Sequence, residues 1–327
     1  MRLEIRHDSA IGWWFISNFR AMVPTHPPFL LKTNSIGMRS DREYPPGRPY
    51  RRHRIVLLGD SFTAGHCVTN GDRFSDLLEG RYPNLDVMNF GLYGSGTDQQ
   101  LIIYETLAKR FEADAYVFAP YWGNIARNMV DLFPFRRSGG EVVWKPKPYF
   151  TLNADELVLY NTPVPSKLLS DDEAEKHFGL SPRSGLAPTL FPGTPQQTAV
   201  LVKLFYALTK PYSGYDSADS GSWRLMRAIL ERFIEEIDGK PVFIVPLPDS
   251  YHYRFGIVPS YLARYNELRN GNENCVVVDA LPYFKRLSRA EQRECSSEDQ
   301  HYLPLGHRVI AEALSDSIEK YCPDLLK

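Results

Sequence analysis

The chain has 327 residues, and its contents of 43% hydrophobic and 24% charged residues are typical of a globular protein. The formal net charge of −1 leaves no broad basic surface for nucleic acid or an anionic membrane. The four cysteines have no CxxC spacing, so they predict neither a metal site nor a disulfide framework.

The N-terminal segment, residues 1–52, is interpreted as an irregular lead-in rich in proline and arginine, and the stretch EYPPGRPYRRHR as exposed. The first five residues, MRLEI, lack the apolar core of a signal peptide, and the run AIGWWFI is too short to span a bilayer. We therefore expect a cytoplasmic protein without a membrane span.

Apolar runs alternating with helical patterns predict a parallel sheet covered on both faces. The runs are RIVLL (54–58), DVMNFG (86–91), AYVFAPYW (115–122), PVFIVPLP (241–248) and CVVVDA (275–280). Three segments have helical spacing of apolar residues. One begins near Thr97, the second is SWRLMRAILERFIEEIDG, with expected caps at Ser222 and Gly239, and the third is GHRVIAEALSDSIEKY. The expected fold is α/β, with a central parallel sheet of about five strands.

One segment, about 136–220, interrupts this alternation. KPYFTLNADELVLYN predicts a hairpin that turns at Asn153-Ala154-Asp155, and the sequence after it has no strong period. We expect an insertion between the third and fourth strands, packed over the end of the sheet where ligands bind. The whole chain, 1–327, is expected to form one domain.

Ser61 follows the first predicted strand in the turn GDSFTAG, where a strand end can present a side chain to a ligand. A serine hydroxyl is a nucleophile only when a base takes its proton and donors stabilise the oxyanion. The alternative is that Asp60 and Ser61 merely cap the turn.

A candidate base, His301, lies in a loop before the last helix, where Glu298 or Asp299 can fold back to its Nδ1. His307 is interpreted as a polar residue at the start of that helix, while His252 follows a strand end and could line the same site. The remaining histidines lack such a context and are interpreted as incidental: His7, His26, His53, His66 and His177.

Two loops could supply oxyanion donors. The glycines of NFGLYGSG let the backbone approach a ligand closely, and Asn124 in WGNIARN carries a side-chain amide, although both stretches also suit ordinary turns. The glycines match neither a P-loop nor G-x-G-x-x-G, so no phosphate-binding loop and no cofactor is expected. No cluster of metal ligands is visible in the sequence, so no metal is expected either.

The order of these motifs resembles that of the SGNH (GDSL-type) hydrolase superfamily, over residues 55–131 and 241–320. GDSFTAG, NFGLYGSG, WGNIARN and EDQHYLPLGHRVIAE resemble its four sequence blocks in turn. The stretch TNSIGMRSDREY also resembles bacterial members, some of which are associated with sugar O-acylation. The resemblance implies a three-layer, flavodoxin-like fold.

The resemblance also implies roles for particular residues. Ser61 would be the nucleophile and His301 the base, and the oxyanion hole would be formed by the N–H groups of Ser61 and Gly94 and by Asn124. Ile125 departs from the family pattern, because an aspartate that helps to anchor this loop is usual there.

The triad acid is open between two neighbours. An Asp-x-x-His pattern would select Glu298, whereas the Asp-x-His form selects Asp299. We prefer Asp299, because a short acid is the family's usual choice, and hold Glu298 in reserve.

The implied function is a serine esterase that cleaves an O-acyl ester, foremost O-acetyl, on a carbohydrate or small metabolite. The alternative is an O-acyltransferase that passes the acyl group to a sugar or metabolite hydroxyl, favoured if the insertion's aromatic residues exclude water. These residues are Trp144, Tyr149, Phe150 and Tyr160. A non-catalytic binding domain has the least support, and the sequence leaves the oligomeric state open.

Overall fold

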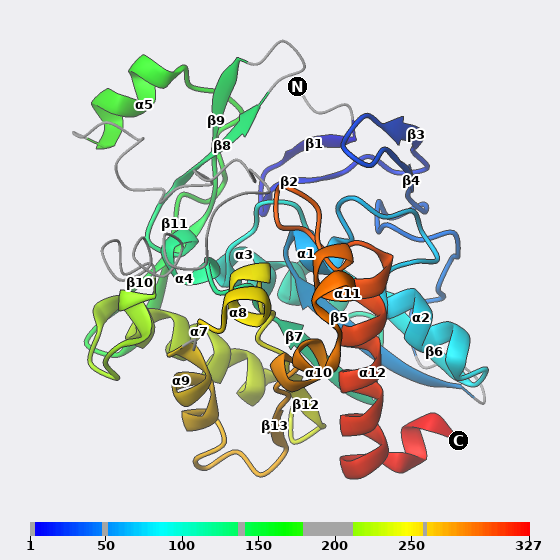
Figure 1. Ribbon diagram of the computed structural model, residues 1–327. Helices are drawn as coiled ribbons and strands as arrows, with labels where there is room; N and C mark the ends of the chain where they lie inside the picture. The colour runs from blue at the N-terminus through cyan, green and yellow to red at the C-terminus, as the bar shows by residue number, and fades with distance from the viewer. Residues whose placement is uncertain (1–3, 48–51, 137–140, 179–211, 258–259) are drawn as a thin grey trace.

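A computed structural model describes residues 4–47, 52–136, 141–178, 212–257 and 260–327. Five parallel strands form its central sheet, in the order β13-β12-β7-β5-β6 (Figure 1). They are β5 (His53–Gly59), β6 (Leu85–Asn89), β7 (Ala115–Ala119), β12 (Val242–Ile244) and β13 (Cys275–Val277). By position along the chain the order is 2-1-3-4-5, the flavodoxin-like order, which confirms the predicted fold class.

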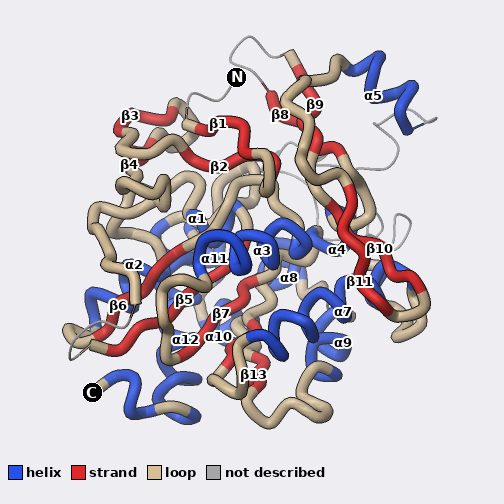
Figure 2. Tube along the Cα trace, turned by 180° about the vertical axis from the view of Figure 1, so that it is seen from behind, coloured by secondary structure: helices blue, strands red, loops and turns tan. Residues whose placement is uncertain are grey.

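Helices cover both faces of the sheet and complete the predicted three layers (Figures 1 and 2). One face carries α3 (Thr97–Ile103), which continues as a π-helical turn (Tyr104–Ala108), α7 (Gly221–Glu236) and α9 (Tyr261–Glu267). The other carries α2 (Phe74–Arg81), α8 (Ser250–Phe255), α10 (Leu281–Arg286), α11 (Arg289–Glu294) and α12 (Pro304–Tyr321). No helix in the described ranges is both long enough and apolar enough to cross a membrane.

The sheet residues alternate between these two layers. In β5, Val56 and Leu58 belong to the core on the side of α3 and α7, whereas Ile55 and Leu57 belong to the core on the side of α12. Because both sets are buried, the strand reads in the sequence as a continuous apolar run.

The N-cap of α7 differs from the prediction. Ser220 occupies it and accepts a hydrogen bond from the Trp223 N–H, so the expected cap at Ser222 is wrong and that residue lies in the first turn. At the other end α7 stops at Glu236, and Gly239 follows with a positive φ of 74°. The sequence Ser-Gly-Ser offers two serines that local pattern alone does not distinguish.

The lead-in is more regular than the sequence indicated. It forms two antiparallel hairpins, β1 (Ile5–Asp8) with β2 (Gly12–Phe15) and β3 (Arg20–Val23) with β4 (Phe29–Lys32). The prediction of an irregular segment is wrong, because β2 is buried at all four positions and shows no polar alternation. Trp13 donates a 2.9 Å hydrogen bond from Nε1 to the Tyr93 carbonyl, which fastens the hairpin to the loop after β6.

The insertion between β7 and β12 contains β8 (Leu132–Arg136), β9 (Val142–Pro146), β10 (Tyr149–Asn153), β11 (Glu156–Tyr160) and α5 (Asp171–Phe178). Ala154 and Asp155 have positive φ values of 47° and 72° between β10 and β11, which confirms the predicted hairpin and its turn. Residues 179–211, most of the segment expected to lack a period, lie outside the described residues. Short 3-10 turns occur at Ser213–Tyr215 and Pro323–Leu326.

Candidate active site

Ser61 is the first residue of α1 (Ser61–Ala64), a single helical turn at the carboxyl end of β5. Asp60 is the N-cap, and its Oδ1 accepts a 3.0 Å hydrogen bond from the Phe62 N–H. Gly65 ends the turn in the left-handed conformation, with φ 79°. Capping by Asp60 thus leaves the Ser61 side chain available, although the residue is only 7% exposed.

His301 reaches Ser61 from the loop before α12. Its Nε2 lies 2.8 Å from Ser61 Oγ, and its Nδ1 lies 3.2 Å from Asp299 Oδ1, within ion-pair distance. The structure therefore brings together a hydroxyl, an imidazole and a carboxylate in the order that general-base catalysis requires. Glu298 is exposed, and no contact between its carboxylate and His301 is present among the described residues.

Asp299 is held by several donors. Its Oδ1 accepts hydrogen bonds from Ser297 Oγ at 2.5 Å and from the His301 N–H at 3.4 Å. Burial acts to raise the pKa of Asp299, but His301, Ser297 and His66 together hold that pKa well below its usual range. The carboxylate is thus ionised at neutral pH, as the orienting acid must be.

An aromatic stack supports the histidine. The Phe62 ring lies 4.5 Å from the Tyr121 ring, nearly parallel to it, and 4.8 Å from the His301 ring. Because Phe62 follows Ser61 directly, the same turn positions the Ser61 hydroxyl and an aromatic ring that packs against His301.

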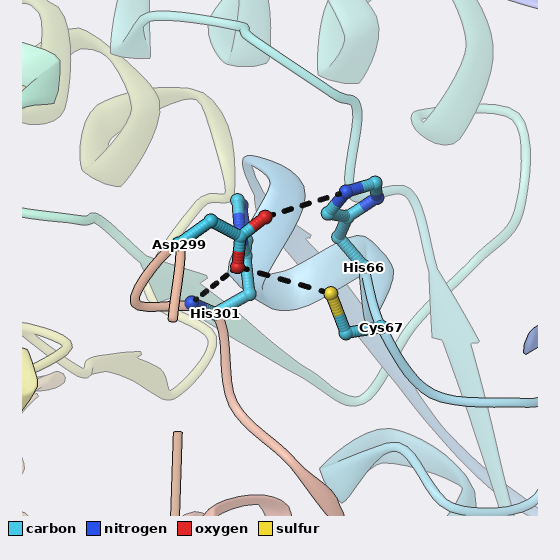
Figure 3. A group of neighbouring side chains, drawn as sticks. All are labelled: His66, Cys67, Asp299 and His301. Carbon is cyan, nitrogen blue, oxygen red and sulfur yellow. Dashed lines mark hydrogen bonds and ion pairs between the residues drawn. The ribbon is translucent and has the colours of Figure 1, made fainter. Parts of the chain in front are cut away.

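His66 and Cys67 also lie beside Asp299 and His301, as Figure 3 shows. His66 Nε2 is 3.8 Å from Asp299 Oδ2, the rings of His66 and His301 are 4.6 Å apart, and Cys67 Sγ is 3.9 Å from Asp299 Oδ1. The interpretation of His66 as incidental is therefore wrong. Both residues directly follow the GDSFTAG motif. Their closeness to Ser61 along the chain was the sequence feature that could have identified them as site residues.

The Cys67 thiol is neutral in this environment. Burial, together with the nearby Asp299 carboxylate, raises the pKa of Cys67 to about 12. With Asp299 and His301, the adjacent pair forms a group of metal-ligating side chains, although the sequence spacing predicted no metal site.

The other two histidines considered as candidates lie in the protein core. His252 Nδ1 accepts a 3.1 Å hydrogen bond from the Asp249 N–H, and its Nε2 bonds to the Tyr212 hydroxyl. Because these bonds and full burial hold the ring, the expectation that His252 lines the site is not met among the described contacts. His307 lies in the first turn of α12, where its Nδ1 accepts the Phe74 N–H.

The glycine loop after β6 approaches α1 closely. A Cβ at Gly91 would lie 2.4 Å from the Ala64 nitrogen, so a side chain cannot be accommodated there. Gly94 has φ 73°, and a Cβ would lie 2.5 Å from the Phe133 ring. Among the described residues, no acceptor bonds to the backbone N–H of Ser61 or Gly94, which leaves both free for an oxyanion.

Asn124 begins α4 (Asn124–Arg127) and is fully buried. Its Nδ2 donates to the Ser95 carbonyl at 2.8 Å and to Asp60 Oδ2 at 3.3 Å. Both amide hydrogens therefore have acceptors, and donation to an oxyanion would require the longer bond, to Asp60, to be released.

Arg127 anchors the loop that lacks the expected aspartate. Its Nη1 donates to Asp60 Oδ2 at 2.7 Å and to the Ser95 carbonyl at 3.1 Å, while Ile125 is buried in the core. Sequence reasoning missed Arg127 because its partner, Asp60, lies 67 residues away.

The insertion's aromatic residues take part in local packing. Trp144 Nε1 donates to Asp171 Oδ1 at 2.7 Å, and the rings of Tyr149 and Tyr160 stack 5.6 Å apart. Phe150 is buried with the Arg232 guanidinium over its ring. These contacts stabilise the hairpins and α5, and they do not favour the acyltransferase alternative.

No model of a known protein family matches the chain, and no curated protein matches it. Among solved structures, the chain is similar to a lipase/acylhydrolase from Enterococcus faecalis, at 15% identity and a TM-score of 0.42, covering 82% of this chain and 96% of the other. It is also similar to a member of the lipolytic protein G-D-S-L family from Veillonella parvula, at 12% identity, 81% and 97% coverage and a TM-score of 0.41. A third similar structure is the psychrotrophic esterase EstA from Pseudoalteromonas sp., at 10% identity, 82% and 98% coverage and a TM-score of 0.41.

Proposed function

We propose that the protein is a serine esterase of the SGNH (GDSL-type) superfamily, with Ser61, His301 and Asp299 as its catalytic triad. The observation that carries the proposal is the 2.8 Å contact between His301 Nε2 and Ser61 Oγ, with Asp299 3.2 Å behind the opposite ring nitrogen. An imidazole placed in this way can accept the serine proton while the carboxylate stabilises the positive charge that forms.

The reaction follows from these positions. Ser61 Oγ attacks the ester carbonyl carbon as its proton moves to His301 Nε2, and the N–H groups of Ser61 and Gly94 donate to the oxyanion. The Asn124 side-chain amide becomes a third donor to the oxyanion if its hydrogen bond to Asp60 is released. The imidazolium then protonates the departing alcohol, and a water molecule, activated by His301, releases the acid from the acyl-enzyme.

A short acyl group suits the confined nucleophile. Ser61 is 7% exposed, and the stacked rings of Phe62 and Tyr121 lie beside its base. We therefore propose O-acetyl groups on a carbohydrate or a small metabolite as the substrate class.

The substitution Ser61→Ala tests the proposal. We expect hydrolysis of p-nitrophenyl acetate to fall by about 10³-fold or more, because the nucleophile is removed, while the melting temperature stays within a few degrees. A fluorophosphonate should label the wild-type protein on Ser61 and should not label the variant.

Ser315→Ala is the matched control, since Ser315 is also buried but lies in α12 and bonds to Tyr82. This variant should keep both ester hydrolysis and labelling. Full activity in Ser61→Ala, or a label on another residue, would rule out the assigned nucleophile.

A further inference from the structure

We propose that His66, Cys67, Asp299 and His301 bind one zinc ion reversibly, and that the bound ion switches off ester hydrolysis. One ligand atom of each residue lies within 4.8 Å of the others, and the side chains cluster around the Asp299 carboxylate (Figure 3). The binding stands on this geometry alone, whereas the inhibition rests on the proposed function.

The distances suit a tetrahedral ion. With zinc bonds of about 2.0–2.3 Å, neighbouring ligand atoms are separated by roughly 3.3–3.8 Å. In the structure Asp299 Oδ1 lies 3.2 Å from His301 Nδ1 and 3.9 Å from Cys67 Sγ, and Asp299 Oδ2 lies 3.8 Å from His66 Nε2. The four ligand atoms all lie within 4.8 Å of one another. Side-chain movements of about 1 Å would bring these separations to the tetrahedral values.

The donor set favours zinc over magnesium or calcium. Two imidazole nitrogens and a sulfur are ligands that zinc prefers, whereas the harder ions select oxygen. On binding, the Cys67 thiol gives its proton to solvent, and thiolate plus carboxylate then neutralise the charge of Zn²⁺. His66 and Cys67 are buried, and the Asp299 side chain, 51% exposed, gives the ion access from solvent.

Inhibition follows from the chemistry of the imidazole. Zinc takes the lone pair of His301 Nδ1, so the single proton of the neutral ring must reside on Nε2. Nε2, which faces Ser61 Oγ at 2.8 Å, then has no lone pair to accept the serine proton. Because the ion bonds to Nδ1, the ring nitrogen that faces away from Ser61, zinc should lower kcat and leave KM unchanged.

The test uses the full-length protein and two metals. Cobalt, which replaces zinc and is visible spectroscopically, should bind at one equivalent and give tetrahedral d–d bands and a sulfur-to-metal charge-transfer band. Added zinc should abolish these bands. Cys67→Ser should lack the charge-transfer band, and Cys322→Ser, which removes a more accessible free cysteine, should keep it.

Zinc inhibition of ester hydrolysis provides the second test. Loss of a residue that only supports a metal ligand costs about 10–100-fold in affinity, so Cys67→Ser should need at least about tenfold more zinc for half inhibition. The inhibition of each variant is measured against that variant's own rate without metal, and Cys322→Ser should be inhibited like the wild type.

The outcomes separate the two proposals. A charge-transfer band that is absent from the wild type, or that survives in Cys67→Ser, would overturn the metal site, as would equal zinc sensitivity of the two cysteine variants. If the band forms as expected but the protein hydrolyses no ester, the metal site stands and the proposed function fails. If the protein hydrolyses the ester but forms no cobalt band, the proposed function stands and the metal site fails.

Discussion

Two adjacent carboxylates precede His301, and the conformation of one residue selects between them. Gln300 has a positive φ of 74°, and this turn folds Asp299 back toward the imidazole. The Asp299 carboxylate then lies 3.2 Å from Nδ1, while Glu298 stays exposed. A sequence pattern does not reveal this turn, because non-glycine residues seldom adopt positive φ.

Asp299→Asn and Glu298→Gln test this selection. The first should lower kcat for p-nitrophenyl acetate by about 10³–10⁴-fold, because the amide neither fixes the working tautomer of His301 nor stabilises the imidazolium. The second should leave kcat within about twofold, since an exposed carboxylate away from the ring contributes little. The reverse ranking in steady-state kinetics would make Glu298 the triad acid.

The catalytic candidates differ in how visible they are in the sequence. Ser61 and His301 were predictable because each lies in a compact motif at an element boundary. His66, Cys67 and Arg127 were not, because their importance arises from contacts with Asp299 and Asp60 that only the folded chain creates.

At the level of elements, an ion pair joins α4 to the turn that carries Ser61. Arg127 and Asp60 are 2.7 Å apart, and their side chains are 16% and 0% exposed. Such a pair adds little net stability, but removing one partner leaves a buried charge without compensation.

Arg127→Met should therefore lower the free energy of unfolding by about 3–5 kcal/mol, measured by urea denaturation. Adding Asp60→Asn in the same chain should recover part of this loss, because the uncompensated charge is gone. Lys109→Met is the control: it breaks an ion pair with Glu236 in which the lysine is 54% exposed, and should cost less than about 1 kcal/mol. Equal losses for Arg127→Met and Lys109→Met would contradict a buried role for Arg127.

For the whole molecule, the sheet was predictable and the lead-in was not. Strands β6, β7 and β12 are buried at every position and β5 at all but its first residue, whereas the edge strand β13 has one buried and two half-buried residues. Each strand still produced an apolar run in the sequence, and the crossover rules then led to the predicted architecture. The apolar runs extended past several strand ends. Val245 to Pro248, for example, continue beyond β12 as a buried loop. In the lead-in, strands of four residues were too short for any period to be recognised.

Global stability should depend on pH through His307. Burial, reinforced by Arg39 and Arg73, lowers the pKa of His307 to about 3, whereas an unfolded histidine titrates near 6.5. Between these values the unfolded chain binds a proton that the folded chain does not, so stability falls with decreasing pH. For this one proton the free energy of unfolding changes by about 1.4 kcal/mol per pH unit. The dependence disappears above the pKa of histidine in the unfolded chain.

His307→Asn should reduce that dependence, because asparagine can still accept the Phe74 N–H but does not titrate. The free energies of unfolding at pH 7 and pH 5 give the comparison. His7→Asn, at an exposed position, should retain the wild-type difference between the two pH values. An unchanged difference in His307→Asn would show that other groups govern acid stability.

The tryptophans of hairpin β1–β2 give the protein an intrinsic optical reporter of the loop that carries Gly94. Trp13 and Trp14, two of the five tryptophans, are buried there, and Trp13 bonds to Tyr93, the neighbour of Gly94. A fusion partner or a trimmed N-terminus that loosens this hairpin should shift tryptophan emission to longer wavelength and release the Gly94 loop. Esterase activity would then decline while the circular dichroism of the parallel sheet and its helices stays intact.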